Sequence, residues 1–152
     1  MKLTSRDVLS FFKSPPKGIT GVLIYGNDSM RVSDKRQQLL QSLLGSNADE
    51  EMRLARISRE ILKKEPEQAI DLCKAQGFFP GERALLIEEA NETITGIIIK
   101  AVEAWKDGDA TIVVTAGSLK PSSNLRKFFE QKKNTYSVPI YDNPMTKFEV
   151  EK

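Results

Sequence analysis

The sequence predicts a single α/β domain with a Rossmann-like, mostly parallel sheet of five strands and helices on both faces. Two observations carry this prediction. Short apolar runs alternate along the chain with longer segments of helical period, which is the order of elements in a parallel sheet. The chain has 152 residues, about the length that encloses one substantial hydrophobic core. We therefore expect residues 1–152 to form one domain.

The strands are predicted from apolar runs bounded by turn residues. Residues 21–25 (GVLIY) and 84–90 (ALLIEEA) are continuous apolar runs, which are typical of strands buried on both faces. Residues 52–57 (MRLARI) alternate between apolar and polar, which places this strand nearer an edge of the sheet. The remaining strands are expected at residues 110–115 (ATIVVT) and 135–140.

The helices are predicted from apolar stripes and from capping residues, prolines and glycines at their ends. Their expected positions are residues 4–12, 31–44, 66–76, 97–105 and a segment that begins after Ser122 or Ser123. Asp28 or Ser29 is expected to cap the second of these helices. Together with the strands, they account for nearly the whole chain.

The composition excludes several kinds of chemistry. The chain has no histidine and only one cysteine, Cys73, which removes Ser-His and Cys-His nucleophiles, an intrachain disulfide and thiolate metal clusters. We expect no metal and no cofactor. The net charge of +2 predicts only weak DNA contact. Because no signal peptide or membrane-spanning run is present, we expect a cytoplasmic protein with no membrane partner.

The loop after the first predicted strand lies where a phosphate-binding loop would lie. Aligning the pattern G-x-x-x-x-G-K-[ST] with it places Gly26 first and Arg31, Val32 and Ser33 at the last three positions. Arg31 replaces the glycine that lets the backbone wrap the phosphates, and Val32 replaces the lysine that reaches their charge. We interpret this segment as a degenerate phosphate loop that does not bind nucleotide, or as an ordinary strand-to-helix turn.

Other charged residues also suggest chemistry that the sequence does not support. Glu88 and Glu89 resemble the acidic pair of a nucleotide hydrolase, but a metal site needs ligands opposite them, so we expect a solvated strand end. A receiver domain that accepts a phosphoryl group would need a pair of acidic residues after the first predicted strand. In this sequence Asp28 stands alone at that place. Ser118 is expected near the strand ends. A basic string is expected on a solvated helix face: Lys120, Arg126, Lys127, Lys132 and Lys133.

The segment GFFPGER places two aromatic residues in a turn. Phe78 and Phe79 lie between Gly77 and the Pro80-Gly81 pair, and such turns normally lie at the surface. Burying a phenylalanine contributes roughly 1.5–3 kcal/mol, so two exposed rings would be a considerable loss. Two arrangements avoid this loss. Either the fold buries one ring and partly covers the other, or a binding partner covers the rings. An aromatic pair on a rigid turn is typical of an interface hot spot.

Three blocks of sequence make the chain resemble the N-terminal domain of the delta subunit of the bacterial DNA polymerase III clamp loader. They are LIYGNDSMRVSDKRQQLL, CKAQGFFPGERALLIEEAN and IVVTAGSLKPSSNLRKFFE. The resemblance covers residues 3–139 and implies an AAA+-like, P-loop NTPase-like domain without a working nucleotide site. It implies binding to the ring-shaped sliding clamp, the beta subunit, and opening of the ring. Phe78 and Phe79 occupy the place of the clamp-binding pair, which is often leucine-phenylalanine in the family.

The resemblance also sets expectations about activity and partners. It implies no intrinsic enzymatic activity, because polymerisation belongs to other subunits of the holoenzyme. Contacts with the other clamp-loader subunits are expected through the helical and collar domains of a complete delta subunit, and we expect this chain to be a fragment or an isolated domain without them. DNA contact is expected to be weak or to need the assembled complex. The alternatives are a degenerate nucleotide-binding or hydrolysing domain using Gly26 and Glu88 or Glu89, and a delta-prime-type or other inactive AAA+ relative.

Overall fold

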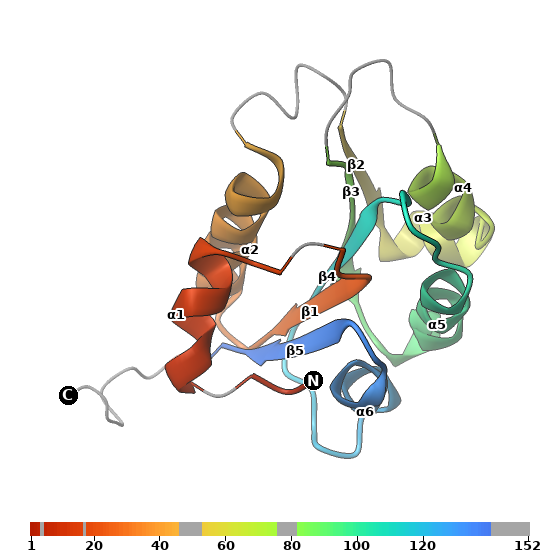
Figure 1. The fold of residues 1–152 in the computed structure, drawn as a ribbon. Helices are drawn as coiled ribbons and strands as arrows, with labels where there is room; N and C mark the ends of the chain where they lie inside the picture. The colour runs from red at the N-terminus through yellow and green to blue at the C-terminus, as the bar shows by residue number, and fades with distance from the viewer. Residues whose placement is uncertain (4, 17, 46–52, 76–81, 141–152) are drawn as a thin grey trace.

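The computed structural model describes residues 1–3, 5–16, 18–45, 53–75 and 82–140 (Figure 1). Its sheet contains β1 (Gly21–Tyr25), β2 (Leu54–Ser58), β3 (Ala84–Ala90), β4 (Thr111–Ala116) and β5 (Thr135–Pro139). The strands pair in the order β2-β3-β4-β1-β5, and every pairing between them is parallel. The predicted α/β fold with a five-stranded sheet is confirmed, and β2 lies at an edge as expected.

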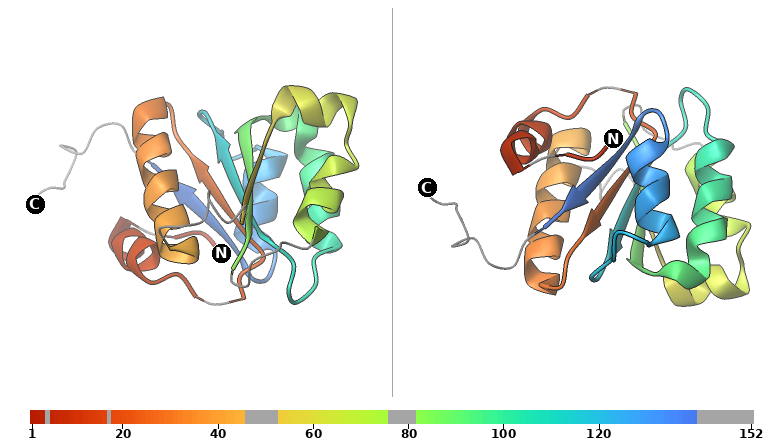
Figure 2. Two further views of the ribbon diagram at one scale, coloured as in Figure 1. Left: turned by 90° about the horizontal axis from the view of Figure 1, so that it is seen from above. Right: turned by 90° about the horizontal axis from the view of Figure 1, so that it is seen from below.

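Helices cover both faces of the sheet (Figures 1 and 2). One face carries α1 (Ser5–Lys13) and α2 (Ser29–Leu44). The other carries α3 (Arg59–Lys64), α4 (Gln68–Lys74), the short η1 (Glu92–Ile94), α5 (Thr95–Glu103) and α6 (Asn124–Gln131). No helix in the described part of the chain has the length and apolar character needed to cross a bilayer.

The strands β1, β3 and β4 are buried on both sides over most of their length, which explains their continuous apolar runs. In β1, Val22 and Ile24 pack with the helices α1 and α2, whereas Leu23 packs on the opposite face. In β3, Leu86 points to the α1 and α2 side and Leu85 to the other. Because alternate side chains enter two different cores, neither face tolerates regular polar positions.

Several element limits differ from the predicted ones for identifiable reasons. The helix α2 begins at Ser29 rather than residue 31, because the Asp28 carboxylate accepts hydrogen bonds from the N–H groups of Met30 (3.1 Å) and Arg31 (3.2 Å). The helix α6 is capped by Ser123, as one of the two predicted alternatives requires. The predicted starts at residues 4 and 52 lie outside the described residues.

The helix α3 was not predicted. Its sequence REILKK buries only Leu62, while Ile61 is exposed, so it shows no apolar stripe of helical period. Ser58 caps its N-terminus at the end of β2, where its hydroxyl accepts from the N–H of Ile61. The predicted helix near Pro66 is α4, which begins at Gln68.

The connections create a crevice at the carboxyl ends of the strands. The chain leaves β1 through α2 toward β2 at one edge of the sheet, and leaves β4 through α6 toward β5 at the other. The loops after the neighbouring strands β1 and β4 therefore diverge. Open α/β sheets bind their ligands at such a switch point.

The thiol of Cys73 is buried under the sheet and is not available for chemistry. Its Sγ lies 3.2 Å from the carbonyl oxygen of Ala110, and burial, with a smaller effect of the Asp109 charge, raises the pKa of Cys73 to about 11. At neutral pH the thiol is protonated and therefore a poor nucleophile.

We predict that Cys73 resists alkylation in the folded protein. At neutral pH, iodoacetamide should leave the native chain unmodified over a period in which the denatured chain reacts fully, because both burial and the raised pKa protect the thiol. Mass spectrometry of the two samples gives the extent of modification. Equal rates with and without denaturant would contradict the packing of α4 against β3 and α5.

Candidate functional site

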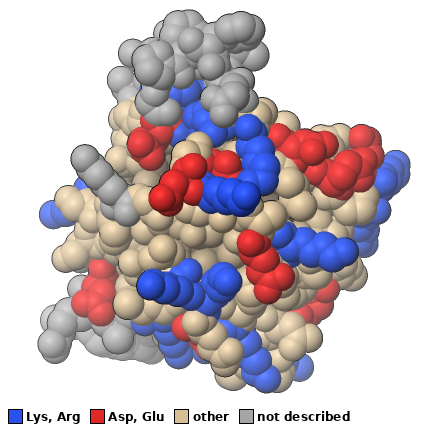
Figure 3. All heavy atoms as spheres, turned by 45° about the vertical axis from the view of Figure 1, so that its right-hand side comes forward, with Lys and Arg blue, Asp and Glu red and all other residues tan. Residues whose placement is uncertain are grey.

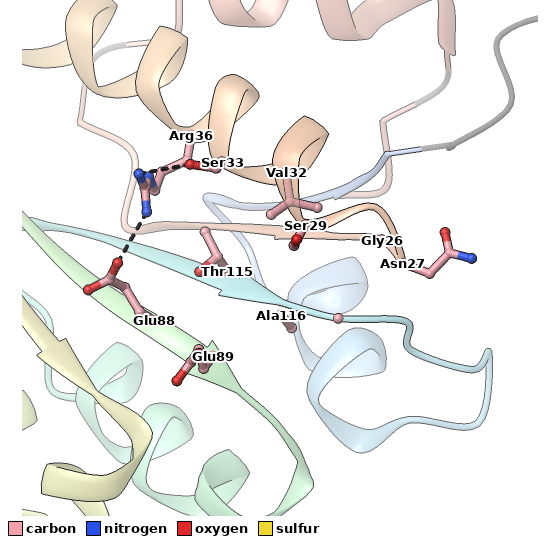
Figure 4. A pocket seen from close by; sticks show the side chains of 11 residues that line it. Gly26, Asn27, Ser29, Val32, Ser33, Arg36, Glu88, Glu89, Thr115 and Ala116 are labelled. Carbon is pink, nitrogen blue, oxygen red and sulfur yellow. Dashed lines mark hydrogen bonds and ion pairs between the residues drawn. The ribbon is translucent and has the colours of Figure 1, made fainter.

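A hollow of about 290 Å³ lies at the switch point of the sheet (Figure 4). Its walls come from the loop after β1, the first turns of α2 and the carboxyl ends of β3 and β4. The lining residues are Gly26, Asn27, Ser29, Val32, Ser33, Arg36, Glu88, Glu89, Thr115, Ala116 and Gly117. This is the place where a sheet of this kind would hold a nucleotide. Whether a nucleotide can bind there depends on the side chains that line the hollow.

Gly26 is required by the packing of the chain against itself. A Cβ atom at this position would lie 2.3 Å from the carbonyl oxygen of Ile140, which is far inside van der Waals contact. The close approach is fixed by β5, since the N–H of Ile140 donates to the carbonyl of Tyr25 at 2.8 Å. The packing against Ile140 thus explains why a glycine occupies the first position of the phosphate-loop pattern, and no bound phosphate is needed for this explanation.

The N-terminus of α2 is occupied by a carboxylate of the chain. Phosphate groups bind helix N-termini through free backbone N–H groups, but here Asp28 accepts from two of these groups. Arg31, at a glycine position of the pattern, forms an ion pair with Asp28 at 3.3 Å and is not among the residues that line the hollow. An incoming phosphate would have to displace the Asp28 carboxylate.

Val32 stands where a phosphate loop has its lysine, and its side chain is only 6% exposed. It packs into the core formed by α1, α2 and one face of the sheet, although it also touches the hollow. The hollow therefore lacks the positive charge that would reach the terminal phosphates. The described residues that line the hollow include no lysine.

Arg36 supplies the positive charge that the hollow does contain. Its Nη1 donates to Oε2 of Glu88 at 3.1 Å, and its Nη2 donates to Oγ of Ser33 at 3.0 Å (Figure 4). The side chains are 17% exposed for Arg36 and 32% for Glu88. The predicted solvated strand end is thus wrong for Glu88, which is half-buried and paired. No local pattern in the sequence marks Arg36 as a residue of this site.

Glu89 is exposed at the end of β3, as predicted. Its φ of 58° lies in the left-handed region, which costs a residue with a Cβ atom roughly 1–2 kcal/mol. The pairing of β3 with β4 shifts in register between Ile87 and Ala90. Arg59 on α3 holds this turn, because its Nη1 donates to the Glu89 carbonyl at 2.8 Å.

The described residues form no metal-holding cluster, and charges of both signs are mixed on the face of the molecule shown in Figure 3. Among the described residues, no group of three or more histidine, cysteine or acidic residues could hold a metal ion. Lys120, Lys127, Lys132 and Lys133 are exposed as predicted. In the view of Figure 3, basic and acidic side chains are interspersed over the surface. This pattern does not favour binding to a polyanion.

Arg126 differs from the other members of the predicted basic string. It pairs with Glu130 at 2.9 Å, donates to the Leu119 carbonyl at 3.1 Å and lies 5.3 Å from the centre of the Tyr25 ring. Its side chain is half-buried rather than solvated. Ser118 lies near the strand ends, as expected, beside Tyr25 and Arg126 in a second hollow of about 280 Å³. Arg126 therefore fixes α6 to the end of β1.

Phe78 and Phe79, the predicted partner-binding pair, lie outside the described residues. The chain has two other adjacent phenylalanine pairs, and both lie on helices. Phe11 and Phe12 on α1 are buried, and of the pair on α6, Phe129 is fully buried and Phe128 is half-buried. A phenylalanine pair on an amphipathic helix is thus accommodated by the core of this fold.

The chain on both sides of the segment 76–81 is fixed to the turn between α5 and β4. Lys74 forms an ion pair with Asp109 at 2.6 Å. Arg83 donates hydrogen bonds to the carbonyls of Ala75 and, at 2.6 Å, Gly108. Burial alone would raise the pKa of Asp109, but the Lys74 hydrogen bond and nearby positive charges lower it. Because Arg83 directly precedes β3, these anchors lie at the amino ends of the strands, which form the amino edge of the sheet. The hollow lies at the opposite, carboxyl ends of the strands.

Comparison with models of known protein families gave no match, and a search of curated protein sequences gave no significant match. The class that the fold defines is therefore an α/β domain with a parallel sheet flanked by helices and a hollow at its switch point. Any function beyond this class is a proposal based on residues and geometry.

Proposed function

We propose that this chain is a non-catalytic interaction domain of the AAA+ type, related to the delta subunit of the bacterial DNA polymerase III clamp loader. The observation that carries the proposal is the combination of an ATPase-like strand order with ligand positions filled by the chain's own side chains. In the order β2-β3-β4-β1-β5, β4 lies between β1 and β3, as in AAA+ ATPases. The dinucleotide-binding sheet instead has the order 3-2-1-4-5-6.

The proposed partner is the ring-shaped sliding clamp, and the proposed contact is Phe78 with Phe79. Two phenylalanines that enter an apolar pocket contribute roughly 3–6 kcal/mol by burial. This energy can bias the ring toward an opened interface only if the open form of the clamp binds the pair better than the closed form. The ion pair of Lys74 with Asp109 and the hydrogen bonds of Arg83 support this role, because they limit the motion of both flanks.

Titration of the sliding clamp into the purified domain tests the proposed function. Calorimetry should show saturable binding, and the same affinity should be measured with and without ATP and magnesium, because the hollow lies at the carboxyl ends of the strands, whereas the anchors that flank the segment 76–81 lie at the amino ends. Absence of binding by the folded domain would refute the proposed partner.

The position of the hollow at the switch point favours one second candidate, a degenerate nucleotide-binding or hydrolysing domain. We predict that this function is absent. Asp28 covers the α2 N-terminus and Arg36 neutralises Glu88, so calorimetric titration with ATP and magnesium should give no binding in the micromolar range. A micromolar dissociation constant would contradict our account of Val32 and Arg36 and would favour the second candidate.

A further inference from the structure

The guanidinium of Arg36 lies between two oxygens that belong to different elements of the fold. Oε2 of Glu88 is at the end of β3, and Oγ of Ser33 is on α2, and each accepts one hydrogen bond from Arg36 (Figure 4). Ser33 holds the hydroxyl position of the phosphate-loop pattern, and Glu88 ends a buried strand. In a working phosphate-loop enzyme, oxygens at such positions face a magnesium ion. Here a single side chain contacts both oxygens.

We propose that Arg36 is a built-in substitute for a bound cation, which holds α2 to the carboxyl end of β3 without metal or nucleotide. The helix α2 packs over β1 and β4, whereas Glu88 belongs to β3, the next strand of the sheet. The Arg36–Glu88 pair therefore joins α2 to β3 beside Thr115 and Ala116 of β4, which line the same hollow. The partial burial of both side chains reduces the screening of the pair by salt, and removal of one partner leaves the other charge partly buried and uncompensated.

Removal of the arginine distinguishes a substitute for a cation from an ordinary ion pair. Only in the first case should an added cation take the place of the lost guanidinium. Without the guanidinium, the Glu88 carboxylate faces a water-accessible hollow together with the Ser33 hydroxyl and Glu89. Magnesium in proteins keeps several of its waters and needs only one or two carboxylates. Removal of Arg36 should therefore make the fold respond to a divalent cation that leaves the wild-type protein unaffected.

The experiment compares the melting temperatures of the wild type, Arg36→Met, Arg36→Lys, Glu88→Gln and the double variant Arg36→Met/Glu88→Gln. Each is measured with magnesium chloride and with sodium chloride of the same ionic strength, so that screening is controlled. We expect Arg36→Met to melt roughly 3–6 °C lower than the wild type in sodium chloride. Magnesium should restore at least half of this loss, and Arg36→Lys should retain most of the stability.

The double variant identifies the carboxylate that binds the ion. Arg36→Met/Glu88→Gln and Glu88→Gln should show no response to magnesium, because neither retains the Glu88 charge. A wild type that gains as much from magnesium as Arg36→Met, or an Arg36→Met variant with no magnesium response, would overturn the proposal. If Arg36→Met does not fold in sodium chloride, folding in magnesium is the expected result, and failure to fold in both salts overturns it.

This inference is independent of the proposed clamp binding. The Arg36–Glu88 pair lies at the carboxyl edge of the sheet, whereas the anchors of the segment 76–81 lie at the amino edge. Arg36→Lys is therefore expected to bind the clamp with wild-type affinity. If the wild type does not bind the clamp, the proposed function is refuted and the assignment of Arg36 is unaffected.

Discussion

Replacement of Gly26 by alanine is expected to lower the free energy of unfolding by about 3 kcal/mol. The added Cβ would lie 2.3 Å from the carbonyl oxygen of Ile140 and 3.3 Å from its carbonyl carbon. The neighbouring atoms are backbone and are fixed by the hydrogen bond from the Ile140 N–H to Tyr25, so no side chain can rotate away. Either β5 must separate from β1 at this end or the loop after β1 must shift.

Denaturant unfolding measures this effect, and Gly96→Ala is the matched control. Gly96 lies in the first turn of α5, where an added Cβ meets no atom within 4 Å. Alanine at such an exposed helical position is expected to stabilise the fold by up to about 1 kcal/mol. The same chemical change should thus have opposite signs at the two glycines. A Gly26→Ala variant as stable as the wild type would mean that the close approach to Ile140 is not a constraint.

The strands could be predicted from the sequence because burial on both faces leaves a local signal. The strands β1 and β3 have the limits that GVLIY and ALLIEEA predict. The helix α3 could not be predicted, because six residues that bury only Leu62 contain too little periodicity. Its existence depends on the Ser58 cap and on packing against β3 rather than on its own pattern.

The candidate site could be predicted only in part. The mismatch of Val32 with a phosphate-loop lysine is visible in a local pattern, and the structure places Val32 at the hollow. Arg36 could not be assigned, because it is 52 positions from Glu88 in the chain and only the three-dimensional fold joins them. The role of Gly26 was likewise hidden, since it depends on the approach of Ile140 after β5. The local sequence pattern shows that the phosphate-loop lysine is missing, whereas only the tertiary contacts show that Arg36 lies at the same site.

Replacement of both Phe78 and Phe79 by alanine is expected to weaken binding to the sliding clamp by at least about 100-fold. Truncation of a hot-spot aromatic residue typically costs 2 kcal/mol or more, and 1.4 kcal/mol corresponds to a factor of ten in the dissociation constant. The two rings are also the only aromatic residues between Tyr25 and Trp105 in the sequence. No other aromatic residue in this stretch of sequence is therefore available to take their place.

The matched control for this change is Phe128→Ala. Phe128 is also one of two adjacent phenylalanines, but it lies half-buried on α6 and packs with Phe129 at 5.8 Å between ring centres. Its truncation should lower the melting temperature and leave clamp affinity unchanged. The double variant Phe78→Ala/Phe79→Ala should show the converse, with a wild-type melting temperature and weakened binding. Equal effects of both changes on affinity would indicate that binding responds only to general loss of stability.

Parallel calorimetric titration of the sliding clamp into the wild type and into the Phe78→Ala/Phe79→Ala variant tests whether Phe78 and Phe79 form the clamp contact. We predict saturable binding for the wild type and a dissociation constant at least about 100-fold higher for the folded variant. Equal affinities for the two folded proteins would contradict it.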